Sequence, residues 1–412
     1  MTITSTSKDP PAVEFDKVWT LEDTFTHAEF RLLYVPPKDE HGKMMIITPS
    51  KHEPSYVPDR KFYALSHLWG TDPKDNLWEV SDFISDEDGT TVDPIPMRKE
   101  KRKTLVNLLQ KIPGYWWIDV LCCRTDLPPV IMRGVYGCCH TCFAMIDCDS
   151  RAFYDVLYIM NRLPHFSADD LEYAREYARR IWKCRWFSRV WTLQELALPS
   201  SVILLSETCG MPCDSHSIDA ESLSEYMGII SYYLAAMRKS DTNVRDLSNE
   251  LDVTTRAVQG YLGLRENDGI QRIQHLSSVL ALFAKSGRSC YFAEDYVYGA
   301  LGILGWDIPR LNNIQDLWDR FLSSLQHFTV KLLWQGMKNS FPENTIKHLQ
   351  ETIHIRISQK AQSYALSAAY NMADVYKGLL YITLNCSCSK CRYVAFYITS
   401  ICGYIKVKIV HK

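Results

Sequence analysis

The chain has 412 residues, 46% of them hydrophobic and 23% charged, which is typical of a globular protein with about two or three domains. Its net charge of −2 creates no overall field that would favour nucleic acid or an anionic membrane, so we expect neither as a partner. The first residues lack the basic start and apolar core of a secretory signal, and 14 Cys are spread along the chain. This pattern predicts a cytoplasmic protein with reduced thiols.

The first half of the chain is predicted to be a disordered tail followed by alternating strands and helices. Residues 1–24 form the tail, because its beginning is rich in Thr, Ser, Lys, Asp and Pro. Short apolar runs predict strands at residues 29–36, 43–48, 61–68, 115–121, 141–148 and 200–205. Helical patterns lie between them, at residues 76–84, 98–112, 130–140 and 169–184. The last helix is expected to run on, with a bend near Trp186, into residues 187–196.

Strands that alternate with helices favour an α/β fold, with a mostly parallel sheet and helices on both of its faces. We expect this domain to cover residues 25–210. A helical region follows over residues 211–345, and residues 346–412 form a C-terminal region of β-branched and aromatic character. No apolar run reaches the ~18 residues that a membrane span needs.

Two predicted strand ends point to a candidate site. In sheets of this kind, ligands bind beyond the carboxyl ends of the strands. Residues 66–70 and 119–124 follow two such ends, and Gly70 lets the backbone turn or approach a ligand closely. We therefore expect the two loops to lie on one edge of the sheet and to form a pocket rim with Glu195.

The segment at residues 187–196 places three functional side chains on one stripe of a predicted helix. Ser188, Trp191 and Glu195 fall at positions i, i+3 and i+7. A hydroxyl, an indole face and a carboxylate together could hold a flat, positively charged ring. The alternative interpretation makes Trp191 a core anchor and Glu195 a solvated or capping residue.

Other motifs limit the chemistry further. Cys386, Cys388 and Cys391 have a C-x-C-x-x-C spacing that could bind zinc or a cluster. The paired ligand spacings of a zinc site are missing, so we interpret these residues as reduced thiols and expect no metal. The sequence lacks G-x-x-x-x-G-K-[ST], H-E-x-x-H and G-x-S-x-G, which argues against P-loop hydrolysis, zincin proteolysis and α/β-hydrolase chemistry.

Three blocks resemble the motifs of the fungal heterokaryon-incompatibility (HET) domain. Residues 63–70 (YALSHLWG) are similar to Y-x-A-L-S-Y-x-W-G, with His67 in place of the second Tyr. Residues 117–122 (WIDVLC) are similar to W-I-D-A-L-C, and residues 189–196 (RVWTLQEL) to R-x-W-T-x-Q-E-L. The resemblance covers about residues 63–205, and residues 288–305 resemble a helical block that often follows the domain.

The resemblance implies a relative of the flavodoxin-like Toll/interleukin-receptor (TIR) fold and a role in fungal self/non-self recognition and programmed cell death. Several TIR domains cleave NAD with a Glu in a W-C-x-x-E-L pattern, which residues 191–196 resemble. The resemblance therefore implies Glu195 as the catalytic residue and NAD as a substrate rather than a bound cofactor.

The candidate residues that contact NAD are Ser66, Trp69, Gly70, Asp119 and Trp191. One hypothesis is an NAD-cleaving enzyme that stays inactive until it self-associates. The alternative is a signalling module of the same fold that acts by assembly alone. Both predict self-association, with an incompatibility partner protein as a further candidate, but only the enzyme predicts loss of NAD.

Overall fold

The computed structural model describes most of the chain up to residue 338 and four strands beyond it. The described residues are 19–40, 42–69, 77–123, 131–161, 167–210, 217–237, 241–262, 275–276, 279–280, 283, 288–311, 313–338, 353–357, 382–386, 394–401 and 404–411.

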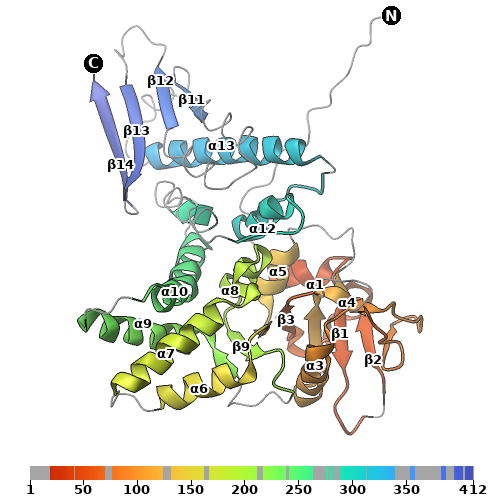
Figure 1. Cartoon of the computed structure of the whole chain (residues 1–412). Helices are drawn as coiled ribbons and strands as arrows, with labels where there is room; N and C mark the ends of the chain where they lie inside the picture. Colours follow the sequence, from red (N-terminus) through yellow and green to blue (C-terminus); the bar gives the residue numbers. More distant parts are fainter. Residues whose placement is uncertain are drawn as a thin grey trace, which may run out of the picture.

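An eight-stranded sheet organises the first half of the chain (Figure 1). Its strand order is β10-β9-β8-β3-β7-β1-β2-β5. The four central strands, β9, β8, β3 and β7, are mutually parallel. At the sides, β10 pairs antiparallel with β9, β1 pairs antiparallel with β7 and β2, and β5 pairs parallel with β2. The bounds are β1 (Leu32–Val35), β2 (Met44–Ile47), β3 (Tyr63–His67), β5 (Ile84–Asp86), β7 (Gly114–Ile118), β8 (Thr141–Ile146), β9 (Val202–Ser206) and β10 (Ser217–Asp219).

Helices cover both faces of this sheet. Successive side chains of a strand point to opposite faces, and every residue of β8 is buried, so neither face of the sheet is open there. Helix α8 packs against β8, while α6 and α9 pack against β9. The helices of this part are α1 (Leu21–Thr26), α3 (Lys99–Lys111), α4 (Asp119–Cys122), α5 (Ile131–Cys138), α6 (Ser150–Met160), α7 (Ala168–Trp182), α8 (Trp191–Ala197) and α9 (Ala220–Ala236).

A helical region follows the sheet, but the predicted start of this region at residue 211 is too early, because β10 at residues 217–219 still pairs with β9. The region contains α10 (Thr242–Leu262), α12 (Asp295–Leu304) and α13 (Ile314–Lys338). Helix α12 packs on α8 and α5, and in Figure 1 it lies between them and α13. Beyond α13, β11 (Ile353–Ile357) pairs antiparallel with β12 (Ile382–Cys386), and β13 (Val394–Ile401) with β14 (Tyr404–His411). Among the described helices, none is long and apolar enough to cross a membrane.

The α/β fold with a mostly parallel sheet is confirmed, but four further local predictions are wrong. The predicted tail reaches residue 24, whereas α1 starts at Leu21, because Thr20 and Asp23 form a reciprocal capping box. The helix predicted over residues 76–84 is absent from the described residues 77–84; they contain β4 (Leu77–Trp78) and the first residue of β5.

The other two errors concern where elements end. The strand predicted over residues 115–121 stops at Ile118, because Asp119 opens the short helix α4. The helix predicted from residue 169 to 196 does change direction near Trp186, as expected, but it is broken there into α7, a 3-10 turn η4 (Arg185–Ser188) and α8. Asp147 accepts a hydrogen bond from the Trp186 backbone N–H at 3.2 Å, which helps to fix the turn outside the helical ladder.

Candidate functional site

The carboxyl ends of β3 and β7 lie side by side, as predicted. In the parallel register of these strands, Leu65 is opposite Ile118, so the residues that follow each strand meet at one edge. His67 Nε2 lies 2.9 Å from Asp119 Oδ1, and the Trp69 indole N–H donates to Asp119 Oδ2 at 2.5 Å. The two loops therefore share one edge through Asp119.

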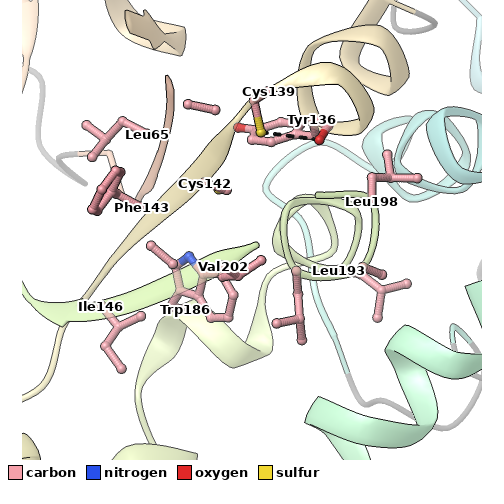
Figure 2. Packing of buried hydrophobic residues seen from close by; sticks show 14 of the residues in the cluster. Leu65, Tyr136, Cys139, Cys142, Phe143, Ile146, Trp186, Leu193, Leu198 and Val202 are labelled. Carbon is pink, nitrogen blue, oxygen red and sulfur yellow. Dashed lines mark hydrogen bonds between the residues drawn. The ribbon is translucent and has the colours of Figure 1, made fainter. Parts of the chain in front are cut away.

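Glu195 reaches the same edge from α8. The Ser66 hydroxyl donates a hydrogen bond to Glu195 Oε2 and accepts one from the Trp186 indole N–H at 2.7 Å. Trp186 itself belongs to the cluster of buried hydrophobic residues that also holds Leu193 of α8 (Figure 2). The predicted proximity of Glu195 to Ser66 is confirmed, and it depends on the indole that fixes the serine.

The predicted pocket rim stays a prediction. Gly70, residues 71–76 and residues 124–130 lie outside the described residues. A cavity of about 220 Å³ that the structure does show lies elsewhere, beside α1. It is lined by Phe25, His52, Tyr56 and Arg60, among others.

Burial determines the charge state of Glu195. Its side chain is only 6% exposed, and this burial raises the pKa of its carboxyl from 4.5 to about 7. The hydrogen bond from Ser66 opposes that rise, because it stabilises the carboxylate. A carboxyl with a pKa near neutrality can exchange a proton or stabilise positive charge at physiological pH.

A second set of buried charges adjoins this pair. Lys101 Nζ lies 2.9 Å from His67 Nδ1 and also donates to the carbonyl of Leu68. Burial lowers the pKa of Lys101 to about 7. Burial, and then the charge of Lys101, lower the pKa of His67. Burial alone would raise the pKa of Asp119, but its interactions with His67 and with the Trp69 indole lower it overall.

Sequence reasoning missed Lys101. Charged residues at the start of the helix predicted over residues 98–112 indicate a solvated face, but Lys101 is fully buried. A signal for burial was present: Lys101 lies four residues before Leu105 and seven before Leu108, which places it on the apolar stripe of α3.

Of the predicted stripe, Trp191 and Glu195 lie four residues apart on α8, but Ser188 lies outside this helix. Ser188 ends the 3-10 turn before α8, and its hydroxyl donates to the carbonyl of Arg185 at 2.8 Å. Trp191 is the first residue of α8 and hydrogen-bonds Asp295 of α12. Trp191 and Glu195 therefore have partners on different elements, and a role of Trp191 in binding NAD stays a prediction.

A distant segment holds the start of α8 in place. The Ser289 backbone N–H donates to the Ser188 carbonyl at 2.7 Å, and the Val190 N–H donates to the Ser289 carbonyl at 3.0 Å. The buried Arg288 donates to the Arg189 carbonyl at 2.5 Å and to the Thr192 hydroxyl at 2.6 Å. Sequence analysis did not identify Arg288 as part of the site.

The cysteine motif cannot be located as a group. Cys386 ends β12, but Cys388 and Cys391 lie outside the described residues. Across the described ranges, no group of three or more metal-ligating side chains converges.

Comparison with known proteins identifies the central part of the chain. Residues 62–195 match the family model described as "Heterokaryon incompatibility protein (HET)". The match runs from the residue before β3 to Glu195, and so contains Ser66, Trp69, Asp119 and Glu195. Searches of curated proteins and of solved structures gave no match. Residues 62–195 of this chain are therefore a HET domain.

Proposed function

We propose that this chain acts in fungal heterokaryon incompatibility, in self/non-self recognition that leads to programmed cell death. We further propose that, after self-association, its HET domain cleaves the bond between nicotinamide and ribose in NAD. The observation that carries the chemical proposal is the hydrogen bond between Ser66 and Glu195 at the edge formed by β3 and β7.

The chemistry fits a single buried carboxylate. Breaking the nicotinamide–ribose bond leaves positive charge on the sugar, as in glycoside hydrolysis, and a carboxylate beside the sugar stabilises that charge. Water then bonds to the same sugar carbon and releases a proton, which gives ADP-ribose. Nicotinamide leaves as a neutral molecule, so no second acid is needed to protonate it. Glu195 supplies the carboxylate, and Ser66 orients it. Trp69, which is 44% exposed and held by Asp119, offers an aromatic face for a ring of the substrate.

Two features connect cleavage to regulation. Because Glu195 is only 6% exposed, a substrate contacts it only after the side chains that cover it move. Self-association would supply the free energy for this movement. Because its pKa is about 7, the carboxyl is ionised above neutrality and protonated below it. The rate of NAD cleavage is therefore expected to rise between about pH 6 and pH 8.

The test combines forced clustering with a matched pair of variants. The purified full-length chain is clustered through a fused dimerisation tag, and nicotinamide release is measured alongside fungal cell death. Glu195→Gln is expected to keep the fold and self-association but to lose NAD cleavage and cell killing. Glu172→Gln, which changes an exposed carboxylate on α7, serves as the control and is expected to retain both activities.

A non-catalytic assembly module is the second candidate. Glu195 is buried and bonded to Ser66, which in turn bonds Trp186. A carboxyl in this position could also have a purely structural role, which favours the second candidate. Exposed aromatic side chains, such as Tyr232 and Tyr291, offer surface for assembly. If Glu195→Gln kills cells as efficiently as the unmutated chain and NAD stays constant in both, cleavage is excluded and this module remains.

A further inference from the structure

A series of contacts connects Lys101, on the buried face of α3, with Trp69 at the surface. Lys101 Nζ lies 2.9 Å from His67 Nδ1, and His67 Nε2 lies 2.9 Å from Asp119 Oδ1. The other carboxylate oxygen of Asp119 accepts the indole N–H of Trp69 at 2.5 Å. Lys101 and His67 are buried, whereas Trp69 is partly exposed. A change at Lys101 can therefore reach the candidate site through His67 and Asp119.

Burial makes the charged form of Lys101 costly, so this form depends on close hydrogen-bond acceptors. A buried ammonium group loses its hydration and needs hydrogen-bond acceptors in return. The charged groups that face it are Glu207, Asp119, Arg98 and Arg189. Glu207 is already paired with Arg98 at 2.8 Å. The direct acceptors of Lys101 are instead the Leu68 carbonyl and the imidazole of His67.

These contacts determine which nitrogen of His67 carries the proton. In its protonated form, Lys101 has three donors and no acceptor, so the Nδ1 that faces this form presents a lone pair. The proton of a neutral imidazole then sits on Nε2, which lies 2.9 Å from Asp119 Oδ1. Without Lys101, Nδ1 would be protonated and would donate to the Leu68 carbonyl, which lies 3.1 Å away.

We propose that Lys101 is a positioning residue that holds His67 in its neutral Nε2–H form, so that His67 fixes the carboxylate of Asp119 and, through it, the indole of Trp69. Removing Lys101 leaves Nδ1 free to bond Leu68 and lets His67 become an imidazolium beside Asp119. Asp119 then pairs with a full positive charge, and its hydrogen bond to the Trp69 indole weakens.

Nitrogen-15 NMR of the full-length chain, labelled at histidine, tests this proposal directly. Loss of a resonance in His67→Gln assigns His67 among the 12 histidines. In the unmutated chain, Nε2 is expected to carry the proton and Nδ1 to be bare. In Lys101→Met, which keeps the length of the aliphatic chain, Nδ1 is expected to become protonated. Lys101→Arg retains a cation and is expected to leave Nδ1 bare.

The matched control is Lys99→Met, which removes an exposed lysine from the same helix and should leave His67 unchanged. The indole N–H resonance of Trp69, assigned through Trp69→Phe, is expected to shift in Lys101→Met and not in Lys99→Met. A protonated Nδ1 in the unmutated chain overturns the proposal, even if Lys101→Met fails to fold. An unchanged His67 pattern in folded Lys101→Met overturns it as well.

This inference depends on the proposed function only for its activity measurement. In the clustered NAD assay, Lys101→Met is expected to raise KM more than it lowers kcat, because Trp69 binds the substrate rather than acting on the broken bond. An equal fall in kcat and kcat/KM would contradict the positioning role. If the unmutated chain cleaves no NAD, the proposed activity fails, while the NMR result still decides the role of Lys101.

Discussion

Replacing Glu195 with Gln is expected to increase the free energy of unfolding relative to the unmutated chain, and this increase is expected to grow as the pH rises. The carboxyl of Glu195 has a pKa of about 7 in the folded chain and an ordinary value of 4.5, because burial disfavours its ionised form. Between these two pH values the folded state holds a proton that the unfolded state releases. The free energy of unfolding therefore falls as the pH rises through this window and levels off above about pH 7.

The size of the effect follows from the two pKa values. Each pH unit between 4.5 and about 7 corresponds to about 1.4 kcal/mol, so full ionisation costs on the order of 3 kcal/mol. Gln has nearly the same shape as the protonated carboxyl and does not titrate. The variant should thus gain on the order of 3 kcal/mol over the unmutated chain at pH 8, and far less near pH 5.

Urea unfolding followed by tryptophan fluorescence measures this difference at several pH values from 5 to 8. Groups that titrate in both proteins largely cancel in the comparison. The control, Glu172→Gln, alters an exposed carboxylate and should show no such dependence. If the stability difference for Glu195→Gln stays constant from pH 5 to pH 8, the carboxyl is not held protonated by burial, and the pH dependence proposed for NAD cleavage is wrong too.

Two further substitutions test the packing of the site by urea unfolding. Ser66→Ala leaves two buried partners of the hydroxyl unpaired and should cost about 2–4 kcal/mol, whereas Ser324→Ala removes only a bond to the Arg320 carbonyl of its own helix and should cost about 0.5 kcal/mol or less. Equal losses of unfolding free energy in the two variants would contradict the hydrogen bonds that Ser66 makes with Glu195 and Trp186. Gly302→Ala places a methyl group against the buried Gln194 and should cost about 1–3 kcal/mol, while Gly137→Ala, with open space around it, should be neutral or stabilising. A neutral Gly302→Ala would show that α12 is not tightly packed on α8.

The strands that carry the site residues could be predicted from the sequence alone. Central strands buried on both faces are continuous apolar runs, so β3, β7 and β8 were recognisable without knowledge of their neighbours. The rule that ligand sites follow parallel strand ends then placed Ser66 and Asp119 on one edge. The family motif supplied Glu195, and its contact with Ser66 agrees with that placement.

The remaining features depend on contacts between distant residues. The sequence predicted a bend near Trp186 but not the break found there, because the acceptor of its backbone N–H, Asp147, lies 39 positions earlier. The hydrogen-bond partners of Lys101 could not be predicted, because His67 and Leu68 come close to it only when α3 packs over the end of β3. The antiparallel side strands β1 and β10 likewise follow from pairing that local periodicity does not specify.

The backbone hydrogen bond between Val190 and Ser289 also means that the start of α8 gains its full support only after Ser289 has been synthesised. At about 5–20 residues per second, the roughly 100 residues between them take about 5–20 seconds to synthesise. Throughout that interval the start of α8 lacks its hydrogen bonds to Ser289 and Arg288. A HET domain still attached to the ribosome therefore cannot complete the support of the helix that carries Glu195. The support of the candidate site is therefore completed only after Ser289 has been made.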